Sequence, residues 1–364
     1  MHKDPIIGID LGTTNSCAAI VEEGGNVKLI PYKGGEYTIP SIFAIDDKGN
    51  ELIGYEAKRQ WQLNPKNTIY GSKRLVGRTF QSDVVTAMKK VVAYSVRPGK
   101  KSEVVLDVGK KEFSLQEISA KILNKIRDVA ANYLKTPIKR AVVTVPAYFN
   151  DRQRQTVKEA GKLIDLEVVR IINEPTAAAL AYGLDKGSQG TFAVYDLGGG
   201  TFDISILKLV DGVFEVKSTG GDSALGGDDF DRAIAQRVLQ ALGETAPAPG
   251  LVAEVLAASR KAKEALTDAP ETELVVGAGA GAHHQTVRRS EVEEWIRPLL
   301  QKTGAVCRRA LKDAGVTAAE LDGVILVGGS TRVPAVRAYV AEIFGREPLG
   351  DIDPDQVVAL GAAV

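Results

Sequence analysis

Two short strand patterns, joined by a polar turn that contains glycine, occur twice in the chain. The first copy has apolar residues at 6–9 and 18–21, and the second has strand patterns at 192–195 and 202–207. Short apolar runs bounded by turn residues predict strands, so each copy is expected to form strand, turn and strand. Each first strand runs into Asp-Leu-Gly, at residues 10–12 and 196–198. This repetition indicates a structural unit that is present twice.

A second pair of segments follows the hairpins in the same order. An apolar strand pattern at 141–145 precedes a helical pattern at about 152–164 and an alanine-rich helix at 176–181. Its counterpart has a strand pattern at 324–327, a helical pattern at about 334–344 and an apolar segment at 357–363. Strands that alternate with helices are typical of α/β proteins. We therefore expect a duplicated α/β fold, with two lobes around a central cleft.

Two longer stretches interrupt these matched segments. They cover about 40–113 and 228–305, and each is expected to form a subdomain inserted into its lobe. A polar, glycine-containing stretch at 185–190 is the expected hinge. Lobe I is thus placed at residues 1–185 and lobe II at 186–364.

The composition excludes several kinds of partner. The 364 residues include 46 basic and 46 acidic side chains, so no net charge attracts nucleic acid or an anionic membrane. No run of about 18 apolar residues predicts a membrane span. Cys17 and Cys307 lie far apart and lack the spacing of a disulfide framework or metal site. A cytoplasmic monomer is the expectation.

The two turns are candidate phosphate-binding sites. Gly12, Thr13, Thr14 and Asn15 form the first, and residues 198–201, Gly-Gly-Gly-Thr, form the second. Glycine lets backbone N–H groups approach an anion closely, because no Cβ intervenes. Neither turn matches the P-loop pattern, and no G-x-G-x-x-G follows a strand. A single Asp-Gly turn would usually only close a hairpin, but two matched copies favour a nucleotide site.

Carboxylates accompany both turns. Asp10 and Asp196 end the first strand of each hairpin, and Asp203 follows the second turn. Carboxylates that face each other across a phosphate site repel unless a hard cation lies between them, and Mg²⁺ suits such a position. The pattern therefore predicts a magnesium-bound nucleotide.

Three further positions have two interpretations each. Glu174 precedes Pro175 at a helix start, where its carboxylate either orients a water or caps the helix. Lys73 lies in a basic cluster at 71–78, and the default expectation for such a lysine is an exposed side chain. In a helical pattern at 254–267, Arg260, Lys263 and Thr267 share a face that either meets a nucleoside or is solvated.

Five motifs resemble the heat shock protein 70 (DnaK-type) chaperones, within the actin-like, ribonuclease H-like ATPase fold group. They are IDLGTTNS at 9–16, VPAYFND at 145–151, NEPTAAA at 173–179, YDLGGGTFD at 195–203 and VGGSTR at 327–332. The resemblance covers nearly the whole chain. It implies a Mg-dependent ATPase with two lobes, whose nucleotide state controls a client-binding domain that is expected to follow residue 364.

The resemblance also implies roles for individual residues. Asp10, Asp196 and Asp203 would surround Mg²⁺ through waters, with K⁺ nearby, and Glu174 would help to organise the metal and its waters. The residues implied to serve hydrolysis are Lys73, Glu174, Thr201, Asp10 and Asp203. The residues implied to contact the nucleotide are Gly12, Thr13, Thr14, Asn15, Gly198, Gly199, Gly200, Thr201, Gly227, Lys263, Thr267, Gly328, Gly329, Ser330, Arg332 and Asp355. Pro146 and Arg154 match the family's relay between the nucleotide and client sites.

Some positions depart from the family pattern. Arg260 stands where the family usually has an acidic ribose contact, and Glu264 stands where many members have an arginine over the adenine. Segments 212–216, 220–231 and 307–316 are similar to the branch devoted to iron–sulfur cluster assembly. The partners implied are a J-domain co-chaperone, a nucleotide-exchange factor, and an unfolded or iron–sulfur scaffold client.

Two other functions remain open for this fold. A small-molecule kinase would need an acceptor site, which the sequence does not reveal, and an actin-like protein would form filaments. The 145–151 and 173–179 motifs favour the chaperone over both by resemblance.

Overall fold

The computed structural model describes residues 4–183 and 189–364, and the chain divides into two compact units. Unit 1 comprises the described residues within Met1–Ser188, Asp211–Phe214 and Asp355–Val364. Unit 2 comprises Gln189–Val210 and Glu215–Pro354. The expected hinge at 185–190 lies mostly outside the described residues.

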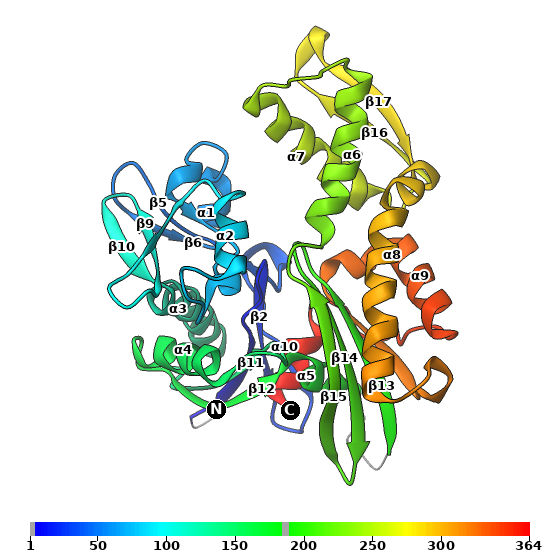
Figure 1. Ribbon diagram of the computed structural model, residues 1–364. Helices are drawn as coiled ribbons and strands as arrows, with labels where there is room; N and C mark the ends of the chain where they lie inside the picture. The colour runs from blue at the N-terminus through cyan, green and yellow to red at the C-terminus, as the bar shows by residue number, and fades with distance from the viewer. Residues whose placement is uncertain (1–3, 184–188) are drawn as a thin grey trace. The chain divides into compact units, whose positions relative to one another are not determined.

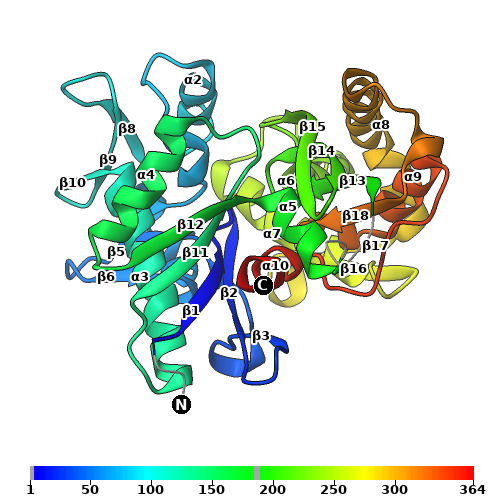
Figure 2. The ribbon, with the colours of Figure 1, turned by 90° about the horizontal axis from the view of Figure 1, so that it is seen from below.

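Unit 1 is built on a sheet with the strand order β12-β11-β1-β2-β3 (Figures 1 and 2). The strands are β1 (Ile6–Asp10), β2 (Asn15–Val21), β3 (Val27–Leu29), β11 (Arg140–Val145) and β12 (Glu167–Asn173), and a short β4 (Ile39–Pro40) pairs with β2. β1 and β2 are antiparallel, whereas β1 is parallel to β11. The strand–turn–strand pattern expected at the start of the chain is confirmed.

Helices cover both faces of this sheet (Figure 2). One face carries α3 (Leu115–Leu134) and α4 (Asp151–Lys162), and the other carries α5 (Glu174–Ala181) and α10 (Val357–Ala363). The N-termini of α3 and α4 are fixed by capping boxes, Ser114 with Glu117 and Asn150 with Gln153. Because side chains alternate along a strand, Ile7 and Ile9 enter the main apolar core while Gly8 meets α10.

The remaining elements of unit 1 are short. They are β5 (Phe43–Ile45), β6 (Glu51–Ile53), β7 (Thr68–Ile69), β8 (Ser95–Pro98), β9 (Val104–Val108), β10 (Lys111–Ser114), α1 (Tyr55–Gln60), α2 (Asp83–Lys89), and the 3₁₀ turns η1 (Lys33–Gly35), η2 (Pro65–Asn67) and η3 (Ser72–Leu75). The strands among them form two three-stranded sheets, β6-β5-β7 and β10-β9-β8. Phe43 and Phe113 join these sheets to the main core through an edge-to-face ring contact at 5.1 Å.

Unit 2 has a sheet of its own, with the order β15-β14-β13-β18. The strands are β13 (Gly190–Leu197), β14 (Phe202–Val210), β15 (Val213–Asp222) and β18 (Gly323–Val327). β13 pairs antiparallel with β14 and parallel with β18, as β1 does with β2 and β11. Tyr195 and Phe202 are fully buried in the core of this unit, to which α8 (Arg289–Ala314) and α9 (Pro334–Phe344) also contribute side chains.

A helical and hairpin segment extends the core of unit 2. It contains α6 (Gly227–Ala241), α7 (Pro249–Ala265), the hairpin β16 (Glu271–Val276) and β17 (His283–Arg288), and the 3₁₀ turn η4 (Gly279–Gly281), while η5 (Ala318–Glu320) and η6 (Gly329–Arg332) flank β18. α6 packs on α7, and α7 packs on β16 (Figure 1). Although α8 has 26 residues, neither it nor any other described helix is long and apolar enough to cross a membrane.

α10 makes unusually close backbone contacts within unit 1. A Cβ added to Gly361 would lie 1.6 Å from the carbonyl oxygen of Ala177 on α5. A Cβ added to Gly8 on β1 would lie 2.4 Å from the backbone nitrogen of Ala363. Both separations are far below van der Waals contact, so glycine is needed at both positions for α10 to pack against β1 and α5.

Replacing Gly361 with alanine is therefore expected to destabilise the protein. The clash should cost about 1–3 kcal/mol, as for overpacked cores, and should outweigh the roughly 1 kcal/mol by which alanine favours a helix over glycine. A lower melting temperature in thermal unfolding followed by circular dichroism would show this. The matched control is Gly250→Ala in α7, where a new Cβ has no atom within 4 Å and stability should not fall. Equal melting temperatures for Gly361→Ala and the parent protein would contradict the prediction.

Candidate functional site

Three ionisable side chains of unit 1 lie together near the end of β1. Lys73 Nζ is 2.5 Å from Glu174 Oε1, and the two side chains are only 12% and 13% exposed. Asp10, the last residue of β1, is close enough for both charges to act on its carboxyl group. The default expectation of a solvent-exposed Lys73 is therefore wrong. Glu174, at the first position of α5, pairs with this lysine, and Asn173 makes no side-chain cap.

Burial strongly perturbs Asp10. Burial first, and then the negative charge of Glu174, raise the pKa of the carboxyl group from 3.8 to about 7. Lys73 and a hydrogen bond from the Thr144 hydroxyl lower it in part, while the charge of Asp355 raises it. Thr144 Oγ1 lies 3.4 Å from Asp10 Oδ1. Asp10 is thus a carboxyl group whose charged form lacks sufficient compensation, and this favours binding of a cation beside it.

The first glycine turn is held by a serine that the sequence analysis did not identify. Ser41 Oγ donates to the Gly12 carbonyl at 2.7 Å, and Ser41 N donates to the Thr14 carbonyl at 2.9 Å. A Cβ on Gly12 would lie 1.9 Å from the carbonyl oxygen of Asn15, so only glycine fits this turn. Thr13 is half-buried, while Thr14 and Asn15 are exposed. The only available signal for Ser41 was its position as a single polar residue within the apolar stretch at 39–45.

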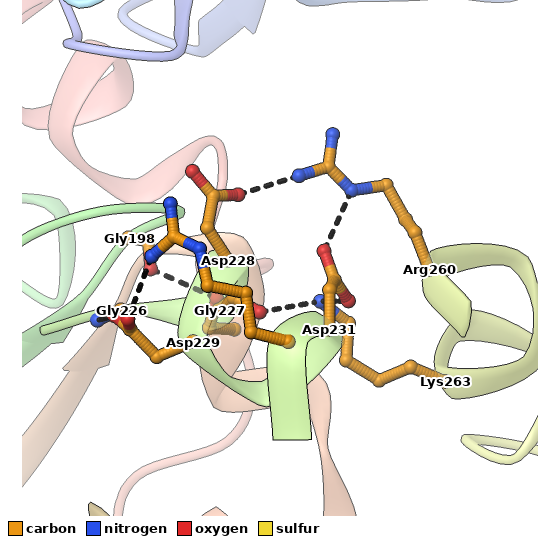
Figure 3. A network of polar contacts seen from close by, with 10 residues as sticks. Gly198, Gly226, Gly227, Asp228, Asp229, Asp231, Arg260 and Lys263 are labelled. Carbon is orange, nitrogen blue, oxygen red and sulfur yellow. Dashed lines mark hydrogen bonds and ion pairs between the residues drawn. The ribbon is translucent and has the colours of Figure 1, made fainter. Parts of the chain in front are cut away.

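The second turn, in unit 2, is joined to the start of α6 by backbone hydrogen bonds (Figure 3). Gly227 N donates to the Gly198 carbonyl at 2.9 Å, and Asp228 N donates to the Gly199 carbonyl at 2.6 Å. A Cβ on Gly226 would lie 2.5 Å from Gly200 N, which explains why glycine precedes the helix. Turn 198–201 and the N-terminus of α6 therefore form one rigid backbone surface.

η6 approaches the same surface. Ser330 Oγ donates to the Gly198 carbonyl at 2.9 Å, and a Cβ on Gly227 would lie 2.2 Å from Ser330 Oγ. Gly328 has a φ of +90°, and a Cβ there would lie 2.4 Å from the Leu197 carbonyl oxygen. Unit 2 thus brings Gly227, Gly328 and Ser330, three of the candidate nucleotide contacts, next to residues 197–199.

Asp196 and Asp203 face each other across the β13–β14 hairpin. They are direct register partners in this antiparallel pair. Carboxylates directly opposite on neighbouring strands repel, and a magnesium ion that keeps several of its waters is suited to such a pair. Among the described residues, no group of three or more His, Cys, Asp or Glu side chains is arranged to hold a metal.

The start of α6 is joined to α7 by an ion-pair cluster (Figure 3). Lys263 Nζ lies 2.7 Å from Asp231 Oδ1 and donates to the Gly227 carbonyl at 3.1 Å. Arg260 contacts both Asp228 and Asp231. Glu264, the second departure from the family pattern, is exposed. The helix itself begins at Pro249 and ends at Ala265, so Thr267 lies just beyond it.

The remaining nucleotide-site candidates lie in different surroundings. Arg332 Nη2 is 2.5 and 2.6 Å from the two carboxylate oxygens of Asp353. Thr267 uses its carbonyl group to accept a hydrogen bond from Arg289. Asp355 belongs to unit 1, where its charge acts on Asp10 and its carbonyl accepts the thiol hydrogen of Cys17.

Arg154 connects α4 with the residue that precedes Glu174. Its Nη2 donates to Asn173 Oδ1 at 2.7 Å, and its Nε donates to the Phe149 carbonyl at 2.9 Å. Pro146 begins the segment that Arg154 holds, directly after β11. Arg154 thereby joins the loop after β11 to the start of α5.

Comparison with protein families gives a match that covers nearly the whole chain. The family model described as "Hsp70 protein" matches residues 6–364. The match includes both glycine turns, the Lys73–Glu174 pair and the α6–α7 cluster.

The raised pKa of Asp10 gives a pH-dependent stability. Between pH about 4 and about 7 the folded, metal-free protein binds a proton that the unfolded chain does not, so this group costs stability as pH rises. Asp10→Asn should match the parent protein near pH 4 and become more stable by roughly 1.4 kcal/mol per pH unit across this window. Thermal unfolding in EDTA from pH 4 to 8 measures the difference.

Asp46 provides a control, because its pKa is shifted in the opposite direction to that of Asp10. Hydrogen bonds from Asn50 lower the pKa of this exposed carboxylate, so its stabilising effect is present above pH about 4 and lost as pH falls. Asp46→Asn should therefore lose stability relative to the parent as pH rises. A constant offset between Asp10→Asn and the parent across pH 4 to 8 would show that Asp10 is not perturbed in this way.

Proposed function

The chain belongs to the Hsp70 family, and from this premise we propose how its residues bind and hydrolyse ATP. Members of this family are chaperones that hydrolyse ATP, and residues 6–364 are such an ATPase domain. The assignments of individual residues below are proposals.

We propose that the two glycine turns bind the phosphate groups of ATP. Residues 12–15 and 198–201 would donate backbone N–H groups, together with Gly227. Support comes from the fixed backbone of each turn, which Ser41 and Ser330 hold by their hydroxyl groups. Lys263, Thr267, Gly328, Gly329, Ser330, Arg332 and Asp355 are proposed to contact the nucleoside.

Magnesium is proposed to be bound through waters by Asp10, Asp196 and Asp203, with potassium nearby. When bound, the metal neutralises charge on the phosphate oxygens. The perturbed carboxyl group of Asp10 and the opposed carboxylates on β13 and β14 support this assignment.

Hydrolysis is proposed to depend on Lys73. Its ammonium group would stabilise charge on the transferred phosphoryl group, while Glu174 holds the lysine side chain in place and Thr201 lies in the second turn. Phosphoryl transfer requires mainly positioning and charge neutralisation, and the burial of Lys73 against Glu174 supports such a role for the lysine. The single observation that carries the proposal is the buried Lys73–Glu174 pair beside Asp10.

Partners and subfamily extend this proposal. A J-domain co-chaperone is proposed as a partner, with Pro146 and Arg154 as the relay from the nucleotide site; the hydrogen bonds of Arg154 to Asn173 and Phe149 support it. The iron–sulfur assembly branch is proposed on the residues at 212–216, 220–231 and 307–316 alone. The need for an exchange factor, the client, and the cytoplasmic location stay predictions.

Replacing Lys73 with alanine should abolish hydrolysis while nucleotide binding survives. Loss of one such charge-stabilising group lowers rates by about 100- to 1000-fold, and affinity for ADP should change only a few-fold. Single-turnover phosphate release and calorimetric titration with ADP and Mg²⁺ measure the two quantities. Lys125→Ala, which removes a partly exposed lysine paired with Glu56 in the same unit, is the matched control and should retain both. Normal phosphate release from Lys73→Ala would refute the role of Lys73.

A further inference from the structure

Arg260 joins two carboxylates of α6 to α7. Its Nη2 lies 2.5 Å from Asp228 Oδ1, and its Nε lies 2.8 Å from Asp231 Oδ2 (Figure 3). Asp231 is 3% exposed, and its second oxygen pairs with Lys263. Two cations from one helix therefore face two carboxylates that lie three residues apart on the other.

Besides Asp231, Lys263 contacts the backbone at the start of α6, next to the second glycine turn. Its Nζ donates to the Gly227 carbonyl, and the N–H of that same residue donates to Gly198. A Cβ on Gly227 would lie only 3.3 Å from the ammonium nitrogen. The position of this ammonium group relative to turn 198–201 is thus closely defined.

Charge balance in the cluster depends on Arg260. Asp228 and Asp231 lie on the same face of α6, where like charges repel. With Arg260 in place, its guanidinium group pairs with both carboxylates, and Lys263 can bind Asp231 and the Gly227 carbonyl. Without Arg260, two carboxylates would compete for the ammonium group of Lys263, which would be drawn away from Gly227.

We infer that Arg260 is a positioning residue for nucleotide binding, which neutralises Asp228 and Asp231 and thereby holds Lys263 at the Gly227 carbonyl. The inference rests on the proposed function, because it takes Lys263 as a nucleoside contact. An arginine suits this role, since its planar guanidinium group binds two carboxylates at once, which a lysine ammonium group does less well.

The test compares ADP affinity in magnesium buffer for the parent protein, Arg260→Ala, Arg260→Lys, Asp228→Asn and the double variant Arg260→Ala/Asp228→Asn. Arg260→Ala should bind ADP about tenfold more weakly, the size of effect common within one ion-pair network. Arg260→Lys should be intermediate. The double variant should regain most of the affinity, because removing the Asp228 charge ends the competition for Lys263. Simple loss of packing between α6 and α7 would not be rescued in this way.

Arg309→Ala is the matched control. Arg309 pairs with Asp313 at 3.8 Å on the exposed face of α8, in the same unit, so affinity should stay within about twofold of the parent. If Arg260→Ala does not fold, as judged by its melting curve, Arg260→Gln replaces it with the same expectations.

The outcomes distinguish the positioning role of Arg260 from the proposed nucleotide binding on which it rests. A parent protein that does not bind ADP would refute the proposed function itself. A parent that binds ADP, with Arg260→Ala binding equally well, would overturn the positioning role alone. Weakened binding that Asp228→Asn fails to restore would also overturn it, since the charge competition would then be absent.

Discussion

Buried charge beside glycine turns is the constraint on which the candidate site depends. Removing an ionised group from water costs several kcal/mol unless a partner of opposite charge compensates for it. In unit 1, Lys73 pairs directly with Glu174 and also acts on Asp10, but its charge offsets the burial of Asp10 only in part. In unit 2, Asp231 is compensated by two cations from α7. In unit 2 one of these cations, Lys263, also donates to the Gly227 carbonyl, so the compensating charge contacts the backbone beside the second turn.

The elements of the fold could largely be predicted because their signals are local. The strands at the two hairpins, the helices α4 and α9, and the parallel pairing partners β11 and β18 follow from apolar periodicity and turn residues within short stretches of chain. The repeated order of these signals also indicated the duplicated α/β architecture, and the match to the Hsp70 family agrees with it.

The contacts that complete the site were not predictable in the same way. Lys73 and Glu174 are 101 positions apart, and nothing near either residue reveals the other, so composition favoured an exposed lysine. Ser41 supports the first turn from a different strand region, and Arg260 joins residues 29 and 32 positions away. Glycine at 12 and 198–200 was recognised for its access to phosphate, whereas the need for glycine at 226 and 361 depends on which backbone lies opposite. Only tertiary structure supplies such information.

The packing of α10 has a mechanical consequence for unit 1. Because Gly8 and Gly361 leave no side chain between the helix and its neighbours, α10 cannot roll about its axis or slide along β1 without a steric collision. A displacement of this helix would press on the backbone of β1, which carries Asp10 at its end. The last helix of unit 1 is thus mechanically coupled, through direct backbone contact with β1, to the strand that ends at the perturbed carboxyl group.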